Sequence, residues 1–235
     1  LDYCPAGTIL EDAVRISAEY TDLPPSIAFF STLALLGASM TQAGFGCKFP
    51  DGKFVQPNIW VIALAPSGSG KTLLLEDVSR FLLENALPQQ LPDTITAAAF
   101  HQYFCADTDD ADLSYRRCRS AFIRDEVNEL FKTLRKESGE ELRDLMLRTY
   151  SGSSLVRATK KDGEQSSPPV LLSFYGSAVD TSFFKAIDSD DYDNGLMQRF
   201  QFLLCHDRPT TRRSWYVFEN GVRESARARF NDVWT

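Results

Sequence analysis

The chain has 235 residues, of which 43% are hydrophobic, and its formal net charge is −7. This length and composition exclude an intrinsically disordered chain and make a single globular domain with one sizeable core the default expectation. The negative charge excludes a surface that binds nucleic acid everywhere, because such a surface would repel phosphate except at a local basic patch.

The cysteines and the apolar runs indicate a cytoplasmic protein. The five cysteines are odd in number and never adopt C-x-x-C spacing, so neither a disulfide framework nor a zinc site is predicted. The longest apolar run, residues 26–40, is too short to span a membrane and reads as a buried helix, so no membrane partner is expected. Because the chain begins with Leu1 rather than Met, we expect it to be part of a longer protein.

The first fifty residues are predicted to form an N-terminal helical cap. Thr8 and Glu11 have the spacing of a capping box in front of a helix over residues 9–20. Pro25 is suited to the first turn of the apolar helix that follows, and Gly44 is expected to close that helix. Residues 51–235 are then expected to form the core.

The most specific motif of the chain is "APSGSGKT", residues 65–72. It matches the phosphate-binding pattern G-x-x-x-x-G-K-[ST] except at Ala65. An apolar strand over residues 57–65 precedes it and a helix over residues 72–87 follows it, which is the order that the motif requires. A chance turn with a solvated lysine is the alternative, and it would make the strand and the helix coincidences as well.

Such a loop binds a nucleotide through consecutive backbone N–H groups that curl around the β-phosphate at a helix N-terminus. Glycines let the backbone approach closely, Lys71 would reach the β- and γ-phosphates, and the Thr72 hydroxyl would lie on Mg²⁺. The predicted cofactors are therefore ATP and Mg²⁺. The predicted nucleotide-binding residues are Ser67, Gly68, Ser69, Gly70, Lys71, Thr72 and Leu73.

A pair of acids follows the next strand. Residues 120–124 are a short apolar run that ends at Asp125 and Glu126. In phosphate-loop ATPases an acid at this place supports the metal, and a glutamate beside it activates the attacking water. Asp125 is therefore a predicted metal ligand and Glu126 a predicted catalytic base. The alternative is an ordinary helix start, where acids favour the helix dipole.

The remaining segments complete a three-layer α/β fold with a mostly parallel sheet. Helices are predicted over residues 96–104, 127–136, 141–150 and 182–187, and Ser138 with Glu141 again has capping-box spacing. A hairpin is predicted over 154–165, and strands over 169–178 and 199–205. Arg199 stands before the last strand, where it is suited to the γ-phosphate of a neighbouring subunit, although a surface arginine is the plainer reading.

The order of these features resembles a known family along nearly the whole chain. The segments "NIWVIALAPSGSGKT", "FIRDEVNEL", "YSGSSLVRATKKDG" and "LMQRFQFLLCHDRP" are similar to the YfjI-like family of unknown function. That family is common in phage and mobile-element proteins and is often joined to primase modules. It resembles in turn the AAA+ branch of phosphate-loop ATPases that includes superfamily-three and minichromosome-maintenance helicases.

The resemblance implies roles for several residues. An R-F pair before the last strand carries the arginine finger in those helicases, which implies this role for Arg199 and implies a homo-oligomer, most naturally a hexameric ring. The hairpin ahead of the sensor strand touches DNA, which implies contacts by Arg157, Lys160 and Lys161, with a solvated charged turn as the alternative. The polar sensor residue would be Ser177.

Two features differ from the family pattern. Members carry a Gln-Pro pair where this chain has "AVD", residues 178–180. A lid domain with its own arginine would follow the last strand, yet only about 30 residues remain there, so the lid is absent or partial and the candidates in it are Arg212 and Arg213.

These observations together predict Mg²⁺-dependent ATP hydrolysis coupled to unwinding or remodelling of single-stranded or duplex DNA, in a phage or mobile-element replication protein. Two alternatives remain. One is a nucleotide-gated scaffold or defence module that binds ATP with little hydrolysis, and the other is a small-molecule kinase that uses the same loop. Glu126 beside Asp125 favours water as the acceptor and so disfavours the kinase.

Overall fold

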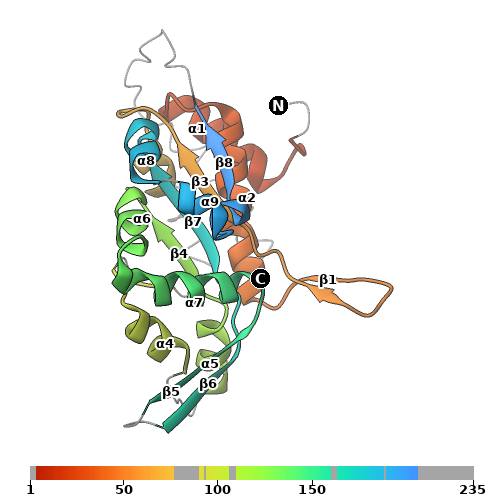
Figure 1. The fold of residues 1–235 in the computed structure, drawn as a ribbon. Helices are drawn as coiled ribbons and strands as arrows, with labels where there is room; N and C mark the ends of the chain where they lie inside the picture. The colour runs from red at the N-terminus through yellow and green to blue at the C-terminus, as the bar shows by residue number, and fades with distance from the viewer. Residues whose placement is uncertain are drawn as a thin grey trace.

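A four-stranded parallel sheet forms the centre of the fold (Figure 1). The computed structural model describes residues 4–76, 90–92, 94–105, 110–159, 163–187 and 189–205. The strand order is β4-β7-β3-β8, and each neighbouring pair is parallel. The strands are β3 (Trp60–Leu64), β4 (Ala121–Arg124), β7 (Ser173–Ala178) and β8 (Gln201–Leu204). Since parallel strands end on the same side, all four finish at one edge, which we call the carboxyl edge.

Strand β3 is buried on both faces. Trp60 and Ile62 belong to one hydrophobic core, whereas the alternate residues Val61 and Ala63 belong to another. This is the result of the two-residue period of a strand whose two sides are both covered by helices. The predicted α/β class with a parallel sheet is therefore confirmed.

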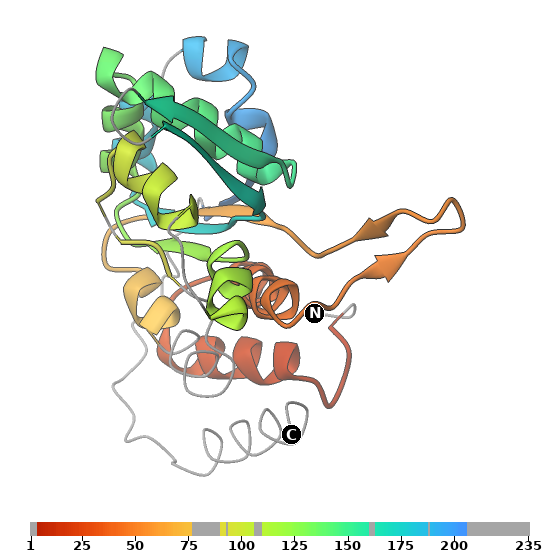
Figure 2. The same ribbon diagram turned by 90° about the horizontal axis from the view of Figure 1, so that it is seen from below.

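Helices cover the two faces of the sheet, and Figure 2 shows α1 and α2 on one side with α7 on the other. The arrangement is compatible with a three-layer α/β fold. The first face carries α1 (Ile9–Tyr20) and α2 (Pro25–Gln42), and the second carries α4 (Ala97–Cys105), α6 (Asn128–Leu134), α7 (Glu140–Tyr150) and α8 (Asp180–Ala186). The shorter helices are α5 (Ala111–Arg117), α9 (Ser189–Asp193), η1 (Glu137–Gly139) and η2 (Met197–Arg199).

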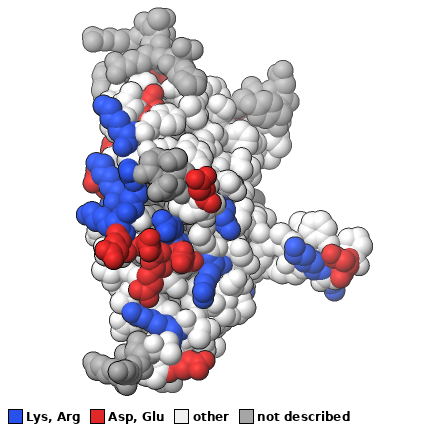
Figure 3. Space-filling view, viewed as in Figure 1, with Lys and Arg blue, Asp and Glu red and all other residues white. Residues whose placement is uncertain are grey.

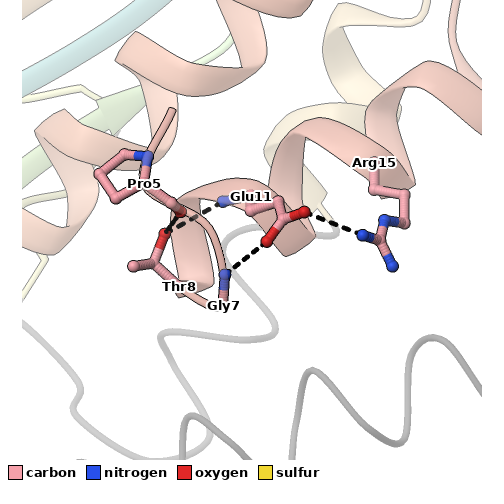
Figure 4. A network of polar contacts seen from close by, with 5 residues as sticks. All are labelled: Pro5, Gly7, Thr8, Glu11 and Arg15. Carbon is pink, nitrogen blue, oxygen red and sulfur yellow. Dashed lines mark hydrogen bonds and ion pairs between the residues drawn. The ribbon is translucent and has the colours of Figure 1, made fainter. Parts of the chain in front are cut away.

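The predicted start of α1 is confirmed, with one change in its capping box (Figure 4). Thr8 is the N-cap, and its side-chain oxygen accepts a hydrogen bond from the N–H of Glu11 at 3.4 Å. The Glu11 carboxylate accepts from the N–H of Gly7 at 2.5 Å and also binds Arg15 at 2.9 Å. The carboxylate thus satisfies a donor one residue before the cap.

The second predicted capping box, Ser138 with Glu141, is wrong. Helix α7 begins at Glu140 after Gly139, and no side chain caps it. A Cβ atom at Gly139 would lie only 2.2 Å from the carbonyl oxygen of Thr133, at the end of α6. The close approach of two backbones therefore fixes where α7 starts, and Ser138 is drawn into the short helix η1.

Two antiparallel hairpins accompany the sheet. The hairpin of β5 (Ser154–Thr159) and β6 (Gly163–Pro169) was predicted and is confirmed. The second pairs β1 (Cys47–Lys48) with β2 (Phe54–Val55) and was not predicted. Residues 45–55, which contain it, project away from the rest of the molecule in Figures 1 and 2, and we call them the arm.

Several predicted features lie outside the described residues. They are most of the predicted helix 72–87, the hairpin tip with Lys160 and Lys161, and the basic tail with Arg212 and Arg213. Within the described ranges, no helix is both long and apolar enough to cross a membrane.

Aromatic rings hold the second face of the sheet together. The ring of Phe174, in β7, lies 5.6 Å from that of Trp60, 5.1 Å from that of Phe122 and 5.0 Å from that of Phe200. These rings come from all four strands or their immediate ends, so Phe174 packs at the centre of the sheet. Such aromatic pairs contribute beyond the area that they bury.

Replacing Phe174 by alanine is expected to lower the free energy of unfolding by about 3–5 kcal/mol, because it removes a buried ring and leaves a cavity. Phe184, on α8, is half exposed and supplies a matched control. Its replacement is expected to cost less than about 0.5 kcal/mol. Urea unfolding followed by circular dichroism measures both, and equal losses would contradict this account of the core.

Candidate functional site

The site is built where β3 ends at the carboxyl edge. The loop of residues 65–70 connects β3 to a helix that begins at Lys71, and the N–H of Leu74 donates to the carbonyl of Gly70 at 2.9 Å. At the other end of the loop, the N–H of Ala65 donates to the carbonyl of Ala178 at 3.2 Å. Ala65 is fully buried, so its methyl group packs in the core and does not disturb the loop. The predicted order of strand, loop and helix is present.

Two glycines allow the loop to turn. Gly68 has a φ of 77° and Gly70 a φ of 92°, in the left-handed region that favours glycine. A Cβ atom at Gly70 would lie 2.8 Å from the Cβ of Thr21, whereas one at Gly68 would meet nothing within 4 Å. Gly70 is therefore needed for packing inside the molecule, and Gly68 leaves open space beside the loop.

The loop presents hydrogen-bond donors that the protein does not use. In the part of the chain that the structure describes, the N–H groups of Gly68, Ser69 and Gly70 have no acceptor. The side-chain oxygen of Ser69, which is 7% exposed, also lacks a partner there. Unused donors at the start of a helix favour an anion, because the positive end of the helix dipole adds to their attraction.

Lys71 lies across this loop with its charge largely buried. Its side chain is 6% exposed, and Nζ donates to the carbonyls of Ala65 at 2.8 Å and Pro66 at 2.9 Å. Burial lowers the pKa of Lys71, and the negative charges of Asp125 and Glu126 act in the opposite direction. The lysine and both predicted acids therefore lie on the same side of the molecule.

Asp125 connects three parts of the site. One carboxylate oxygen accepts a hydrogen bond from the Thr72 hydroxyl at 2.6 Å. The other accepts from the Ser177 hydroxyl and from the N–H of Glu126, the latter at 3.0 Å. The structure thus brings together Thr72, Asp125 and Ser177, which were predicted from separate segments.

Glu126 has an unusual backbone. Its φ of 52° is the only positive value for a non-glycine residue within the described ranges. Such a conformation costs about 1–3 kcal/mol and is concentrated at functional sites. The N–H of the next residue, Val127, donates to the Ser177 carbonyl at 2.9 Å and so fixes this turn against β7. The Glu126 side chain is exposed at the carboxyl edge.

Sequence reasoning missed two supports of the site. The turn after α1 packs on the loop, since the N–H of Asp22 donates to the Ser69 carbonyl at 3.2 Å and Thr21 packs against Gly70. Asp180, at the start of α8, is close enough to Lys71 to oppose the lowering of its pKa. The sequence position of Asp180 offered the same signal as that of Asp125, because both acids come just after a predicted buried strand. The sequence offered no such signal for Thr21.

Arg199 lies away from the loop of its own chain. It precedes β8, so it is at the edge of the sheet opposite to the carboxyl edge. Its Nη1 donates to the carbonyl of Gly195 at 2.6 Å, and its guanidinium lies 5.5 Å from the centre of the Tyr150 ring. Arg199 therefore does not face the loop of its own chain, and its predicted role toward a neighbouring subunit stays a prediction.

The predicted DNA-binding hairpin is described only in part. Arg157, on β5, is about one-third exposed, and its Nε lies 3.7 Å from a carboxylate oxygen of Glu141 on α7. An exposed ion pair of this kind contributes little to stability. Arg157 is thus accessible at the surface but has a carboxylate beside it.

The site could hold a magnesium ion only together with a phosphate. Among the described residues no group of three or more His, Cys, Asp or Glu side chains is placed to hold a metal. The protein offers the oxygens of Thr72 and Asp125, 2.6 Å apart. This limited set fits Mg²⁺, which is usually bound by one or two carboxylates, substrate phosphates and several waters.

Comparisons with known proteins do not place the chain in a family. No family model matches it, and no curated protein matches it. Its function is therefore inferred from the chemistry of the site.

Replacing Lys71 by methionine is expected to stabilise the ligand-free protein near neutral pH, because the buried ammonium disfavours the folded state. Folding lowers the pKa of Lys71 below the value of 10.5 that it has in the unfolded chain. At any pH between these two pKa values, the unfolded chain therefore binds more protons than the folded protein. Wild-type stability should therefore rise relative to the variant as the pH increases through that window. Chemical unfolding at pH 7 and near pH 10 measures the difference, and a variant that is less stable at pH 7 would contradict the expectation.

Proposed function

We propose that this protein is a Mg²⁺-dependent ATPase of the phosphate-loop class. One observation carries the proposal: the unused N–H groups of residues 68–70, the Lys71 ammonium and the Thr72–Asp125 pair lie at one edge of a parallel sheet. Donors, a cation and a metal-binding oxygen pair match a triphosphate with its magnesium ion. The resemblance of "APSGSGKT" to phosphate loops supports the same ligand.

In this proposal the loop binds the β-phosphate through the backbone of residues 67–73. Lys71 exchanges the carbonyls of Ala65 and Pro66 for oxygens of the β- and γ-phosphates. Thr72 and Asp125 hold the magnesium ion, which neutralises charge on the phosphates when bound. The Ser177 hydroxyl, which donates to Asp125, would act as the sensor of the γ-phosphate.

Hydrolysis needs a base for water, and Glu126 fills that role. Glu126 is exposed, and its N–H donates to the Asp125 carboxylate at 3.0 Å, so it lies next to the proposed metal ligand. The oxygen of the water attacks the γ-phosphorus while Glu126 takes a proton from that water. The bond between the γ-phosphorus and the bridging oxygen breaks, and ADP leaves with its electron pair. The positive φ of Glu126 supports this assignment, because strained backbone conformations of this kind are concentrated at active sites, where a side chain needs a particular orientation.

The strand order supports an ATPase over a small-molecule kinase. Strand β7 lies between β3, which leads into the loop, and β4, which carries the acids. This is the additional strand after which the hydrolysing class of phosphate-loop proteins is named. The AAA+ helicases that the sequence resembles belong to that class, so we propose coupling to DNA unwinding or remodelling in a homo-oligomeric ring.

In such a ring Arg199 acts on the neighbouring subunit. Its position at the edge opposite its own loop supports action in trans over action in cis. It would have to leave the Gly195 carbonyl and the Tyr150 ring to reach a γ-phosphate. Arg157 on the β5–β6 hairpin remains a proposed contact with the DNA backbone, as do Lys160 and Lys161, which follow β5 in the sequence and lie outside the described residues.

Glu126→Gln is expected to leave ATP binding intact and to lower the rate of phosphate release by about 10²–10⁴-fold, because the amide cannot accept the proton. Glu129→Gln, three residues along and exposed, is the matched control and should keep the wild-type rate. Binding is measured with a fluorescent ATP analogue and turnover by phosphate release with and without single-stranded DNA. A wild-type protein that binds ATP but releases no phosphate would support the scaffold instead.

Arg199→Ala and Lys71→Ala are each expected to be inactive alone, yet a mixture of the two should recover part of the turnover. In a mixed ring the intact loop of an Arg199→Ala subunit lies next to the intact Arg199 of a Lys71→Ala subunit. Phosphate release across a range of mixing ratios tests this. An inactive mixture of two folded variants that co-assemble would overturn the role in trans.

A further inference from the structure

The arm exposes aromatic side chains to solvent. Phe45, Phe49 and Phe54 are each more than half exposed, at 56%, 51% and 54%, and Val55 is 39% exposed. Figure 2 shows that the arm extends from the body as a two-stranded ribbon. An isolated hairpin is only marginally stable in water, and exposed apolar residues gathered in this way indicate a binding surface.

Both faces of the ribbon combine an aromatic ring with a lysine. Lys48 pairs with Phe54 in the register of the two strands, so their side chains are on the same face. Phe49 donates its N–H to the carbonyl of Lys53 at 2.8 Å, which places Phe49 opposite Lys53, and Val55 shares their face by alternation. A surface that packs on a protein would be expected to gather its apolar residues on one face, and this ribbon does not.

Phe54 forms a supported platform. A Cβ atom at Gly46 would lie 2.6 Å from the Cζ atom of Phe54, so the ring lies directly over the backbone of the opposite strand. The same Cβ would lie 2.6 Å from the carbonyl oxygen of Val55. Gly46 therefore makes room for the ring, one side of which rests on the ribbon while the other remains accessible.

The charges of the arm favour an anionic ligand. Lys48 and Lys53 are exposed, and neither forms an ion pair with any residue that the structure describes. Asp51 is the only acid of the arm. One of its carboxylate oxygens accepts a hydrogen bond from the N–H of Lys53 at 2.9 Å and so points toward the backbone of the turn. The arm thus carries a net positive charge in a chain whose total is −7, and Figure 3 shows both basic and acidic atoms at the surface of the arm.

We propose that the arm binds single-stranded nucleic acid, with bases stacked on Phe49 and Phe54 and phosphates beside Lys48 and Lys53. Single-stranded binding sites combine aromatic platforms with positive charge, because every base offers a face for stacking and every linkage a phosphate. The inference takes from the proposed function only that the protein meets DNA. It needs neither ATP binding nor hydrolysis.

The test measures binding of a fluorescein-labelled oligothymidylate to the full chain by anisotropy, without nucleotide. The double variant Phe49→Ala, Phe54→Ala is expected to bind at least about tenfold more weakly. The double variant Phe49→Leu, Phe54→Leu should be weakened to a similar degree, because leucine remains apolar but offers no ring for stacking. Phe30→Ala, which removes an exposed phenylalanine of α2, is the matched control and should bind as the wild type does.

The lysines are tested through salt. Replacing Lys48 and Lys53 by glutamine should reduce the slope of log K against log salt by about 1.4, since each phosphate contact with a single strand contributes about 0.7. Thermal melting checks that each variant is folded, which is expected because the arm lies outside the core.

Three results would overturn the proposal. In the first, the leucine variant keeps wild-type affinity, which would show apolar docking instead of stacking. In the second, the alanine variant changes only the oligomeric mass, which would make the arm a contact between copies of the chain. In the third, it changes only binding to lipid vesicles. The two proposals can fail separately. If the wild type binds no ATP but the arm variants still bind the oligonucleotide more weakly than the wild type does, the proposed ATPase is refuted and the arm proposal stands.

Discussion

The hydrogen bonds of the Asp125 carboxylate are the interaction on which the site depends. Strand β4, which carries Asp125, is not a neighbour of β3, because β7 lies between them. The carboxylate nevertheless contacts the Thr72 hydroxyl after the loop and the Ser177 hydroxyl on β7, and so ties the ends of three strands together. Charge-assisted hydrogen bonds of this kind are stronger than neutral ones. They hold the helix after the loop in a fixed position relative to the acids.

This arrangement leaves the loop incompletely satisfied in the protein alone. The N–H groups of residues 68–70 point to no acceptor in the described structure, and Lys71 keeps a buried positive charge against two carbonyls. The buried charge of Lys71 costs stability in the empty protein, and a polyanion would supply acceptors both for that charge and for the N–H groups of the loop. Polar groups without a full set of hydrogen-bond partners thus gather at the place where a ligand is expected, as is common at functional sites.

The parts of the structure that the sequence predicted well are those with local signals. The strand over residues 60–64, the glycine loop and the acids after β4 each follow from patterns within a dozen residues. The support of Gly70 by Thr21 could not be predicted, because it joins segments about fifty residues apart. The start of α7 could not be either, since tertiary packing of Gly139 on α6 overrides the cap that Ser138 offered.

The arm was missed for a different reason. Phenylalanines at positions 45, 49 and 54 look like core residues in a sequence, and their exposure becomes visible only when the ribbon is seen to project from the body. The turn at residues 49–52 carried a readable signal in Pro50, Asp51 and Gly52, but the paired strands are only two residues each. Hydrophobicity alone does not distinguish a buried residue from one kept for a partner.

Strand β3 connects the two proposed binding sites, the nucleotide site at one end and the nucleic-acid site at the other. At one end β3 leads into the loop, and at the other it follows the arm through Asn58, whose side chain donates to the Tyr150 carbonyl at 3.0 Å. The ring of the same Tyr150 lies under Arg199 and edge-on to Trp60. Because β3 is buried throughout and paired on both sides, it moves as a rigid element with its neighbours. The arm precedes β3 and Arg199 precedes β8, so both lie at the edge of the sheet opposite to the carboxyl edge, and a nucleic acid held by the arm would be at the edge where Arg199 contacts Tyr150.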